Sequence, residues 1–321
     1  MEHKKNIGGY FELELPCKAE YYTNAVRLNT GRNCLEYILR LRQYKKVYIP
    51  YYTCEVVLEP FHKLNIEYEF YHINEKLELA DSIQLKEKEA ILYTNYFGLK
   101  SSYLNVLKNE FGTKLIVDNT QAFYSKPLQA VDSFNTCRKF FGVSDGAYCF
   151  TDKLLDEDFE QDKSFDCLDF LTKRIDLSAE EGYADFKKQS ELLENSPIKT
   201  MSRFTQRMMC AIDYEGIAQK RIANYRQLEN ALGKTNGIHL LLDKNDVPMV
   251  YPYFTKDKDL RSMLIENKIF VAKYWPNVEH WCSNDMFERQ LCECLLPLPV
   301  DQRYGAENME RIIKLLEKYE R

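Results

Sequence analysis

The chain has 321 residues, of which 45% are hydrophobic and 29% are charged, a globular composition that excludes long disordered or low-complexity regions. Its 44 Lys and Arg against 49 Asp and Glu give a net charge of −5 without a basic run, which argues against a nucleic-acid partner. No uncharged apolar run reaches about 18 residues and none follows the basic first residues, so we expect neither a membrane span nor a signal peptide.

The first half of the chain alternates β-rich runs with amphipathic stretches. We predict helices at Asn33–Tyr44, Val56–Lys63 and Ser102–Phe111, between strands at Lys46–Ile49, Ile66–Tyr71, Ala90–Thr94, Leu115–Asp118 and Ala147–Thr151. Strands that alternate with helices indicate a mostly parallel sheet covered on both faces. Ligands bind such sheets at the carboxyl ends of the strands, so the residues just after each strand are the candidates for function.

The second half has a different pattern. Residues 154–199 are polar and acidic, and we expect helices and a connection there. Next come a long helix at Glu215–Leu232 with Gly233 as its C′ residue, strands at Val247–Phe254 and Ile269–Tyr274, and a last helix at Ala306–Tyr319. We therefore predict a large α/β domain over residues 1–214 and a smaller α+β domain over residues 215–321.

The 10 cysteines favour a cytoplasmic protein, because most of them lie in apolar stretches, as reduced and buried thiols do. No CxxC pair occurs. Cys292 and Cys294 form a CxC, but no second Cys or His pair lies near enough in sequence to complete a zinc site. We therefore predict structural thiols and no metal.

Residues 142–146 fit the GxSxG pattern of a hydrolase nucleophile elbow, with Ser144 at its centre. That motif needs a helix directly after the serine, whereas Ala147–Phe150 has the pattern of a strand. A turn bounded by glycines is the favoured interpretation, and a serine hydrolase is the alternative.

Three other positions carry candidate chemistry. Gly31 begins an amphipathic stretch that Thr30 or Asn33 could cap, and free N–H groups at a helix N-terminus suit a phosphate, although neither a Walker A sequence nor GxGxxG is present. Asp118 ends an apolar strand, where a carboxylate is costly without a partner or a ligand. Lys139 lies beside a second cation and two phenylalanines, a setting that favours a nucleophilic amine. The plain alternatives are a capped helix, a turn residue and a solvated lysine.

Taken together and in order, these segments resemble the DegT/DnrJ/StrS family, the PLP-dependent aminotransferases of nucleotide-linked sugars. The resemblance covers nearly the whole chain, and it rests on the Gly31 turn, Tyr48–Thr53, Tyr93–Gly98, Asp118–Ala122, a Ser…Lys segment that ends in Asp145-Gly146, Met201-Ser202, Arg221–Leu228 and Leu296–Pro299. It implies the PLP-dependent transferase fold type I, pyridoxal 5′-phosphate as the cofactor, a nucleotide sugar and an amino donor as substrates, and a cytoplasmic homodimer.

The resemblance also implies a role for each matching residue. Gly31 and Arg32 would contact the cofactor phosphate through backbone N–H groups, and Ser133 would bind the same phosphate. Asp118 would pair with the pyridine nitrogen and keep the ring protonated as an electron sink. Gln121 would lie beside the ring oxygen.

The Schiff base would fall to Lys139, although the family spacing of five residues after Ser133 leads to Arg138. Counting back from Asp145-Gly146 favours Lys139 instead. Neighbouring side chains of an extended segment point to opposite faces, so only one of the two cations can easily face the ring.

By their positions after strands or near the C-terminal substrate region, Tyr52, Asn95 and Trp275 are candidate substrate residues. The sequence therefore predicts a sugar aminotransferase. A sugar-nucleotide-binding or regulatory protein on the same fold, with its chemistry lost, is the second hypothesis, because Arg138 stands at the usual lysine spacing.

Overall fold

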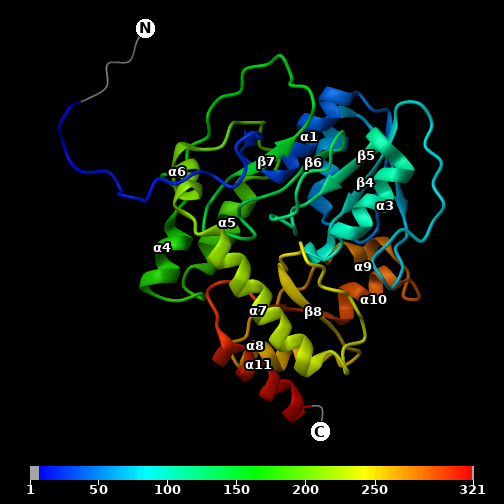
Figure 1. The fold of residues 1–321 in the computed structure, drawn as a ribbon, viewed down its shortest axis with the longest axis vertical. Helices are drawn as coiled ribbons and strands as arrows, with labels where there is room; N and C mark the ends of the chain where they lie inside the picture. Colours follow the sequence, from blue (N-terminus) through cyan, green and yellow to red (C-terminus); the bar gives the residue numbers. More distant parts are fainter. Residues whose placement is uncertain (1–6, 320–321) are drawn as a thin grey trace.

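The computed structural model describes residues 7–319, and its central feature is a seven-stranded sheet (Figure 1). β7 is antiparallel to both of its neighbours, and all other neighbouring strands are parallel. This confirms the predicted mostly parallel sheet and the five predicted strands. The spatial order is β1 (Val26–Leu28), β7 (Ala147–Phe150), β6 (Asp132–Phe134), β5 (Leu115–Asp118), β4 (Glu89–Thr94), β2 (Lys46–Pro50) and β3 (Glu67–Tyr71).

Both faces of this sheet are covered, as its sequence requires. Every residue of β4 and β5 is buried, so these central strands have no solvent-facing side. One face packs against α1 (Gly31–Arg42) and α2 (Glu59–Leu64), which follows a 3₁₀ turn at Glu55–Leu58. The other face packs against α3 (Ser101–Phe111) and the C-terminal elements, with 3₁₀ turns at Tyr96–Gly98 and Gly112–Lys114.

The N-terminus of α1 is fixed by Thr30, one of the two predicted caps. The Thr30 side chain accepts a hydrogen bond of 3.1 Å from the backbone N–H of Asn33, so the helix begins at Gly31, two residues before the predicted start. The first turn of α1 lies close to Thr120 and Asn135, which follow the carboxyl ends of β5 and β6.

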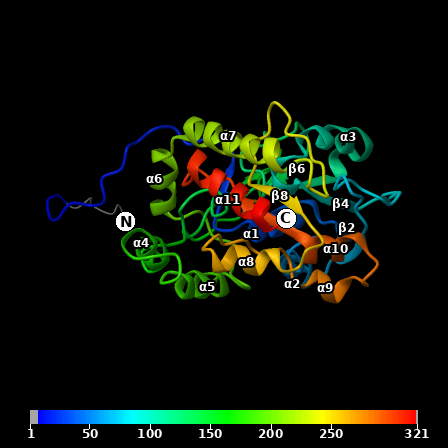
Figure 2. The same ribbon diagram turned by 90° about the horizontal axis from the view of Figure 1, so that it is seen from below.

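The polar segment after β7 forms helices, as predicted, and the long predicted helix is α7. The chain then builds a two-stranded antiparallel ribbon and a group of short helices, and α11 packs against α7 and α8 (Figure 2). These elements are α4 (Asp169–Asp176), α5 (Tyr183–Leu192), α6 (Arg203–Ala211), α7 (Tyr214–Leu232), β8 (Val250–Phe254), α8 (Leu260–Glu266), α9 (Val278–Trp281), α10 (Phe287–Cys294), β9 (Leu295–Pro299) and α11 (Ala306–Tyr319).

The prediction of a strand at Ile269–Tyr274 is wrong, because β8 pairs with β9 instead. Two prolines in β9 conceal it in the sequence. A two-stranded ribbon tolerates them, because each strand has one edge that forms no backbone hydrogen bonds with a neighbouring strand. A proline, which lacks an N–H, costs nothing on that edge. The 269–274 segment is held otherwise: a guanidinium nitrogen of Arg261 donates to the carbonyls of Val271 and Ala272.

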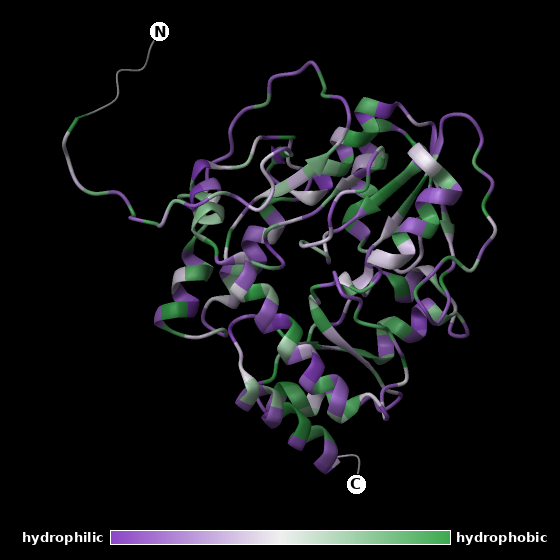
Figure 3. Ribbon diagram, in the orientation of Figure 1, coloured by the Kyte–Doolittle hydropathy of each residue, from purple (hydrophilic) through white to green (hydrophobic). Residues whose placement is uncertain are grey.

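Apolar side chains form two clusters, one on each face of the large sheet. In Figure 3 the central strands are mostly green and the helices alternate green and purple, as amphipathic helices do. The larger cluster continues from Tyr93 and Val117 under the sheet to Tyr251 and Leu298 of the ribbon. The predicted division at residue 214 coincides with the start of α7, but the core continues across it, and the division stays a prediction.

Within residues 7–319, every helix is too short or too polar to cross a lipid bilayer.

Candidate active site

The predicted site residues gather where β5 and β6 end beside the first turn of α1. Asp118 is the last residue of β5, and the chain turns directly after it. A Cβ placed on Gly31 would lie 3.0 Å from Thr120 Cγ2 and 3.7 Å from the Asn135 carbonyl oxygen. Gly31 thus lets the helix approach the turns that follow the two strands.

Asp118 is buried, with 5% of its surface exposed. Its Oδ1 accepts a hydrogen bond of 2.7 Å from the backbone N–H of Thr120. Burial raises the pKa of Asp118 above its ordinary value, and the charge of Lys139 and the bonds from Thr120 oppose this rise. A cationic partner would therefore stabilise the charged form of Asp118.

Lys139 is exposed, and its Nζ donates a hydrogen bond of 3.1 Å to Thr120 Oγ1. Thr120 thus links the amine to the carboxylate: its hydroxyl accepts from Lys139, and its backbone N–H donates to Asp118. The structure brings the predicted amine and the predicted acid together through one residue. Thr120 stands inside the motif Asp118–Ala122, but no pattern in the sequence marked it.

The neighbouring cation turns away from this group. Arg138 donates a hydrogen bond of 3.4 Å from Nη2 to Ser190 Oγ on α5, whereas Lys139 reaches Thr120. Burial, followed by the nearby charge of Arg32, lowers the pKa of Arg138 to about 10. The adjacent side chains of Arg138 and Lys139 point in different directions, as expected, and Lys139 is the one near Asp118.

The other predicted phosphate residues lie around α1. Arg32 is partly buried and forms an ion pair of 2.6 Å with Glu59. Ser133 is buried in β6, and its hydroxyl has no hydrogen-bond partner in the structure. Because the strand alternates, Ser133 faces away from Phe134, whose ring lies near Gly31. Its contact with a phosphate stays a prediction.

Gln121 supports a strained turn. Phe97 adopts a left-handed conformation with φ 59°, which is costly for a non-glycine residue. Gln121 Oε1 accepts a hydrogen bond of 2.9 Å from the Phe97 N–H, and the Phe97 carbonyl accepts one of 2.8 Å from the N–H of Met249. The side-chain nitrogen of Gln121 is the donor that the predicted ring contact would use.

The three candidate substrate residues do not form one group. Tyr52 and Trp275 pack edge to face with their ring centroids 4.6 Å apart, and the buried Tyr52 hydroxyl has no hydrogen-bond partner in the structure. Asn95 is fully buried, and its side chain bonds to Asn119 at 3.0 Å and to the N–H of Lys100 at 3.1 Å. Asn95 therefore holds the turn after β4 in shape.

The GxSxG segment forms a turn, as the favoured interpretation predicts. Gly146 has φ +106°, and a Cβ there would lie 2.8 Å from Thr205 Cγ2. The Ser144 hydroxyl is buried without a hydrogen-bond partner in the structure. Asp145 accepts bonds from Ser164, Ser202 and Thr205, so its carboxylate anchors the 145–205 region.

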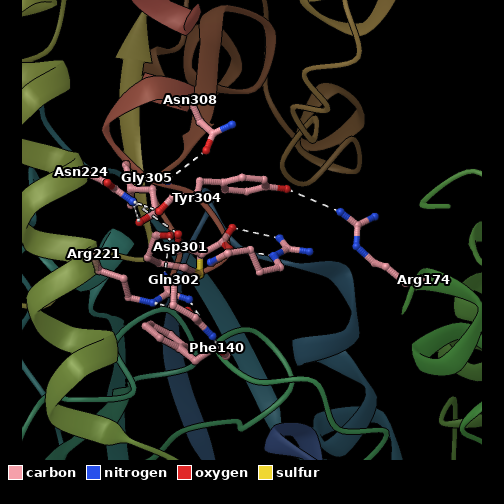
Figure 4. A network of polar contacts seen from close by, with 12 residues as sticks. Phe140, Arg174, Arg221, Asn224, Asp301, Gln302, Tyr304, Gly305 and Asn308 are labelled. Carbon is pink, nitrogen blue, oxygen red and sulfur yellow. Dashed lines mark hydrogen bonds and ion pairs between the residues drawn. The ribbon is translucent and has the colours of Figure 1, made fainter. Parts of the chain in front are cut away.

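A clamp that the sequence does not reveal fixes the residue after Lys139 (Figure 4). The Phe140 carbonyl accepts hydrogen bonds of 2.7 Å from Gln302 Nε2 and 3.5 Å from Arg221 Nη2. The Arg221 guanidinium also lies 4.5 Å from the centroid of the Phe140 ring and donates to the carbonyls of Pro248 and Met249. Elements around α7 and β9 thereby set the backbone that carries the amine.

No family model and no curated protein matches this sequence. Solved structures do match, and they have the same fold. They include DesV from S. venezuelae (17% identity, TM-score 0.65, 94% of this chain and 85% of that chain) and a DegT DnrJ EryC1 StrS aminotransferase from Brucella abortus (13%, 0.60, 92% and 85%).

A third similar structure is the sugar aminotransferase Spr1654 from Streptococcus pneumoniae in its PLP form, described as putative (13% identity, TM-score 0.60, 92% of this chain and 87% of that chain). The same protein has also been solved in a PMP form. The chain therefore has the fold of the DegT/DnrJ/EryC1/StrS aminotransferases, which confirms the predicted fold class. At these identities the similarity establishes the fold alone.

Proposed function

We propose that this chain is a PLP-dependent aminotransferase that acts on a nucleotide-linked keto sugar. The observation that carries the proposal is the Lys139–Thr120–Asp118 group at the carboxyl end of β5, beside the N-terminus of α1. On a mostly parallel sheet this edge is where ligands bind. The solved aminotransferases of the same fold support the same assignment.

The residues present support the cofactor at both of its ends. The phosphate would lie at the first N–H groups of α1, beside Arg32. At the ring end is Asp118, an acid whose pKa is raised by burial and which a protonated pyridine nitrogen would stabilise as a carboxylate. Gln121 would donate to the ring oxygen.

When bound, pyridoxal phosphate supplies an electron sink for carbanion chemistry. Asp118 would hold a proton on the pyridine nitrogen. The amine of Lys139 would accept a proton from the amine-bearing carbon of the amino donor and would later return one to the sugar carbon that receives the amine, which needs a mobile side chain near solvent. Thr120 would orient that amine through its hydroxyl, and the clamp on Phe140 would limit the movement of the backbone that carries it.

We propose that the protein acts as a homodimer. Exposed apolar side chains support this: Ile7, Tyr10, Phe11 and Leu13 lie on an N-terminal arm that extends away from the body in Figure 1. Ile175, Leu177, Tyr183 and Leu192 are exposed on and around α4 and α5, on the same side of the molecule. Large exposed apolar groups of this kind mark interaction surfaces. Light scattering of the purified chain will give its mass in solution.

The direct test is covalent trapping. The purified protein is incubated with PLP, reduced with borohydride, digested and sequenced by mass spectrometry. We expect the pyridoxyl label on Lys139, no label in Lys139→Ala, and a retained label in Arg138→Ala. A label on another lysine, or none on the wild-type protein at saturating PLP, contradicts the assignment of Lys139.

Two observations favour the second hypothesis, a sugar-nucleotide-binding protein without chemistry. Arg138 stands at the usual lysine spacing, and Lys139 is exposed in the structure. A uridine or thymidine diphosphate sugar that binds with no PLP present, without turnover from any amino donor, would support this alternative. Amine transfer to a keto sugar nucleotide would support the enzyme.

A further inference from the structure

Two helices of this chain bury almost nothing. α4 has no buried residue, and α5 buries only Gln189. The large apolar side chains on these helices and on the segments beside them are exposed: Phe165, Ile175, Leu177, Tyr183, Phe186 and Leu192. We call this surface the α4–α5 face. Helices this short gain most of their stability from packing, so a partner that covers the face would stabilise both of them.

The N-terminal arm, residues 7–17, is an apolar segment that its own body leaves uncovered. Tyr10 and Phe11 are 99% and 92% exposed. The arm is held at its base, where the Lys18 N–H donates to the Cys210 carbonyl at 2.8 Å, and Glu12 lies 3.4 Å from Arg207 of α6. From there it extends away from the body in both views (Figures 1 and 2). The arm therefore does not cover the α4–α5 face of its own chain.

The arm has the pattern of a strand with one apolar side. Phe11, Leu13 and Leu15 alternate with Glu12 and Glu14, and an extended chain places alternating side chains on opposite sides. At about 3.3 Å per residue, residues 7–14 reach about 26 Å, whereas two packed helices are about 20 Å wide. The arm is long enough to lay its apolar side across both α4 and α5.

These two surfaces select each other within a two-fold pair. Most of the large apolar side chains that are exposed within residues 7–319 lie either on the arm or on the α4–α5 face. Two arms paired with each other would place Glu12 and Glu14 of both copies side by side, which like-charge repulsion disfavours. A reciprocal exchange about a two-fold axis instead covers both arms and both faces.

The area involved is that of a stable interface. Burial of an aromatic side chain such as Tyr10 or Phe11 removes about 150–250 Å² from water, and the surface that receives it loses a similar area. Two arms, each with two aromatic side chains, therefore bury roughly 1,200–2,000 Å² in total, which is the size of a standard stable interface.

We propose that the N-terminal arm of one copy lies across the α4–α5 face of a second copy, and that the exchange is reciprocal. The inference rests on the homodimer proposed above and adds which surfaces meet. It also concerns the active site, because Arg138, the residue before Lys139, donates to Ser190 of α5. The arm of the second copy covers the helix on which the amine-bearing segment rests, so each site is complete only in the pair.

The test is disulfide trapping between two full-length proteins that are co-expressed with different affinity tags. Both carry Cys17→Ser, which removes the exposed thiol of the arm. One carries Phe11→Cys and the other Ile175→Cys, and the mixture is oxidised with copper phenanthroline. The matched control replaces Ile175→Cys by Val106→Cys, an exposed position on α3 at the opposite side of Figure 1. We expect at least about tenfold more linked heterodimer with Ile175→Cys than with this control.

A second measurement does not depend on the geometry of a disulfide. Phe11→Ser should raise the dissociation constant of the dimer by about tenfold or more in analytical ultracentrifugation, because it removes a large buried aromatic side chain from each arm. Val106→Ser is the control and should change the constant less than about twofold.

The outcomes separate the exchange from the proposed function. A linked heterodimer supports the exchange. It is overturned by a monomeric protein, by a dimer that neither links nor responds to Phe11→Ser, or by a link that forms only within one chain carrying both Phe11→Cys and Ile175→Cys. Borohydride labelling with PLP is measured in the same preparations. A label on Lys139 without the exchange leaves the aminotransferase standing, whereas the exchange without a label supports the arm and contradicts the proposed function.

Discussion

The Nζ atom of Lys139 lies 3.1 Å from the hydroxyl oxygen of Thr120, whose backbone N–H donates a hydrogen bond of 2.7 Å to the carboxylate of Asp118. One residue thus lies between an exposed amine and a buried acid. Lys139 and Thr120 stand in segments that follow two different strands, and Thr120 is the first residue to change.

Thr120→Val removes the hydroxyl and keeps the shape of the side chain. We expect borohydride labelling of Lys139 by PLP to be slowed roughly fivefold, the equivalent of one hydrogen bond of about 1 kcal/mol, because the amine loses its anchor. Thr120→Ser should restore the rate. The exposed Thr113→Val is the control and should label as the wild-type protein does. Equal labelling rates for Thr120→Val and Thr120→Ser would contradict the role of the hydroxyl as an anchor for the Lys139 amine.

Asp118→Asn should make the cofactor-free protein more stable. A carboxyl group whose pKa is higher in the folded state than its ordinary 3.8 binds protons more tightly when folded. The fold therefore loses stability as the pH rises from about 3.8 through the raised value.

Urea unfolding of Asp118→Asn and wild-type protein at several pH values tests this relationship. We expect the variant to have the higher midpoint at pH 7 and the difference to shrink as the pH falls toward 3.8. We also expect PLP to bind the variant roughly tenfold more weakly or worse, because the charge-assisted bond to the ring nitrogen is lost. A variant that is less stable than wild type at pH 7 would mean that Asp118 is stabilised by a partner in the folded state.

Gly31→Ala should destabilise the fold and weaken phosphate binding. Its Cβ would lie 3.0 Å from Thr120 Cγ2, which is tighter than ordinary contact, and overpacking of this kind costs about 1–3 kcal/mol. Gly142→Ala is the matched control, since its Cβ would meet Leu171 Cδ2 at an ordinary 3.7 Å. Urea midpoints that fall equally in the two variants would contradict the close approach of α1 to Thr120.

Arg221→Met should lower the free energy of unfolding by about 3–5 kcal/mol. Arg221 is 1% exposed, and its loss leaves the carbonyls of Pro248 and Met249 without these donors. Arg226→Met, on an exposed position of the same helix, should change it by less than about 0.5 kcal/mol. Chemical denaturation compares the two, and a small effect at Arg221 would show that the clamp on Phe140 is dispensable.

Much of the fold could be predicted because its signals are local. β4 and β5 are apolar throughout, and buried parallel strands need no alternation. The sequence does not predict β1 and β6, because each has three residues and carries a charge. Asp132 of β6 is neutralised by Arg42 from α1. That ion pair joins residues 90 positions apart, so no local pattern could reveal it.

The candidate site also contains residues that local sequence patterns indicate and residues that only the folded chain brings together. Asp118, Gly31 and the cation pair stand at ends of regular elements, where the sequence can mark them. The spacing from Ser133 could not decide between Arg138 and Lys139, because that choice depends on which side chain faces Thr120. The clamp joins Phe140 to α7 and to the segment after β9, a contact that only the folded chain creates.

The apolar cluster that continues from the large sheet into the ribbon also limits how this chain can be cut or recombined. A fragment that starts at α7 would expose the apolar side chains that pack against the large sheet in the whole chain. We therefore expect it to aggregate when it is expressed alone. In a chimaera that takes its last third from another protein of this architecture, the apolar side chains on both sides of the junction must pack together without gaps or clashes. The reason is that the junction lies inside a packed core rather than at a hinge.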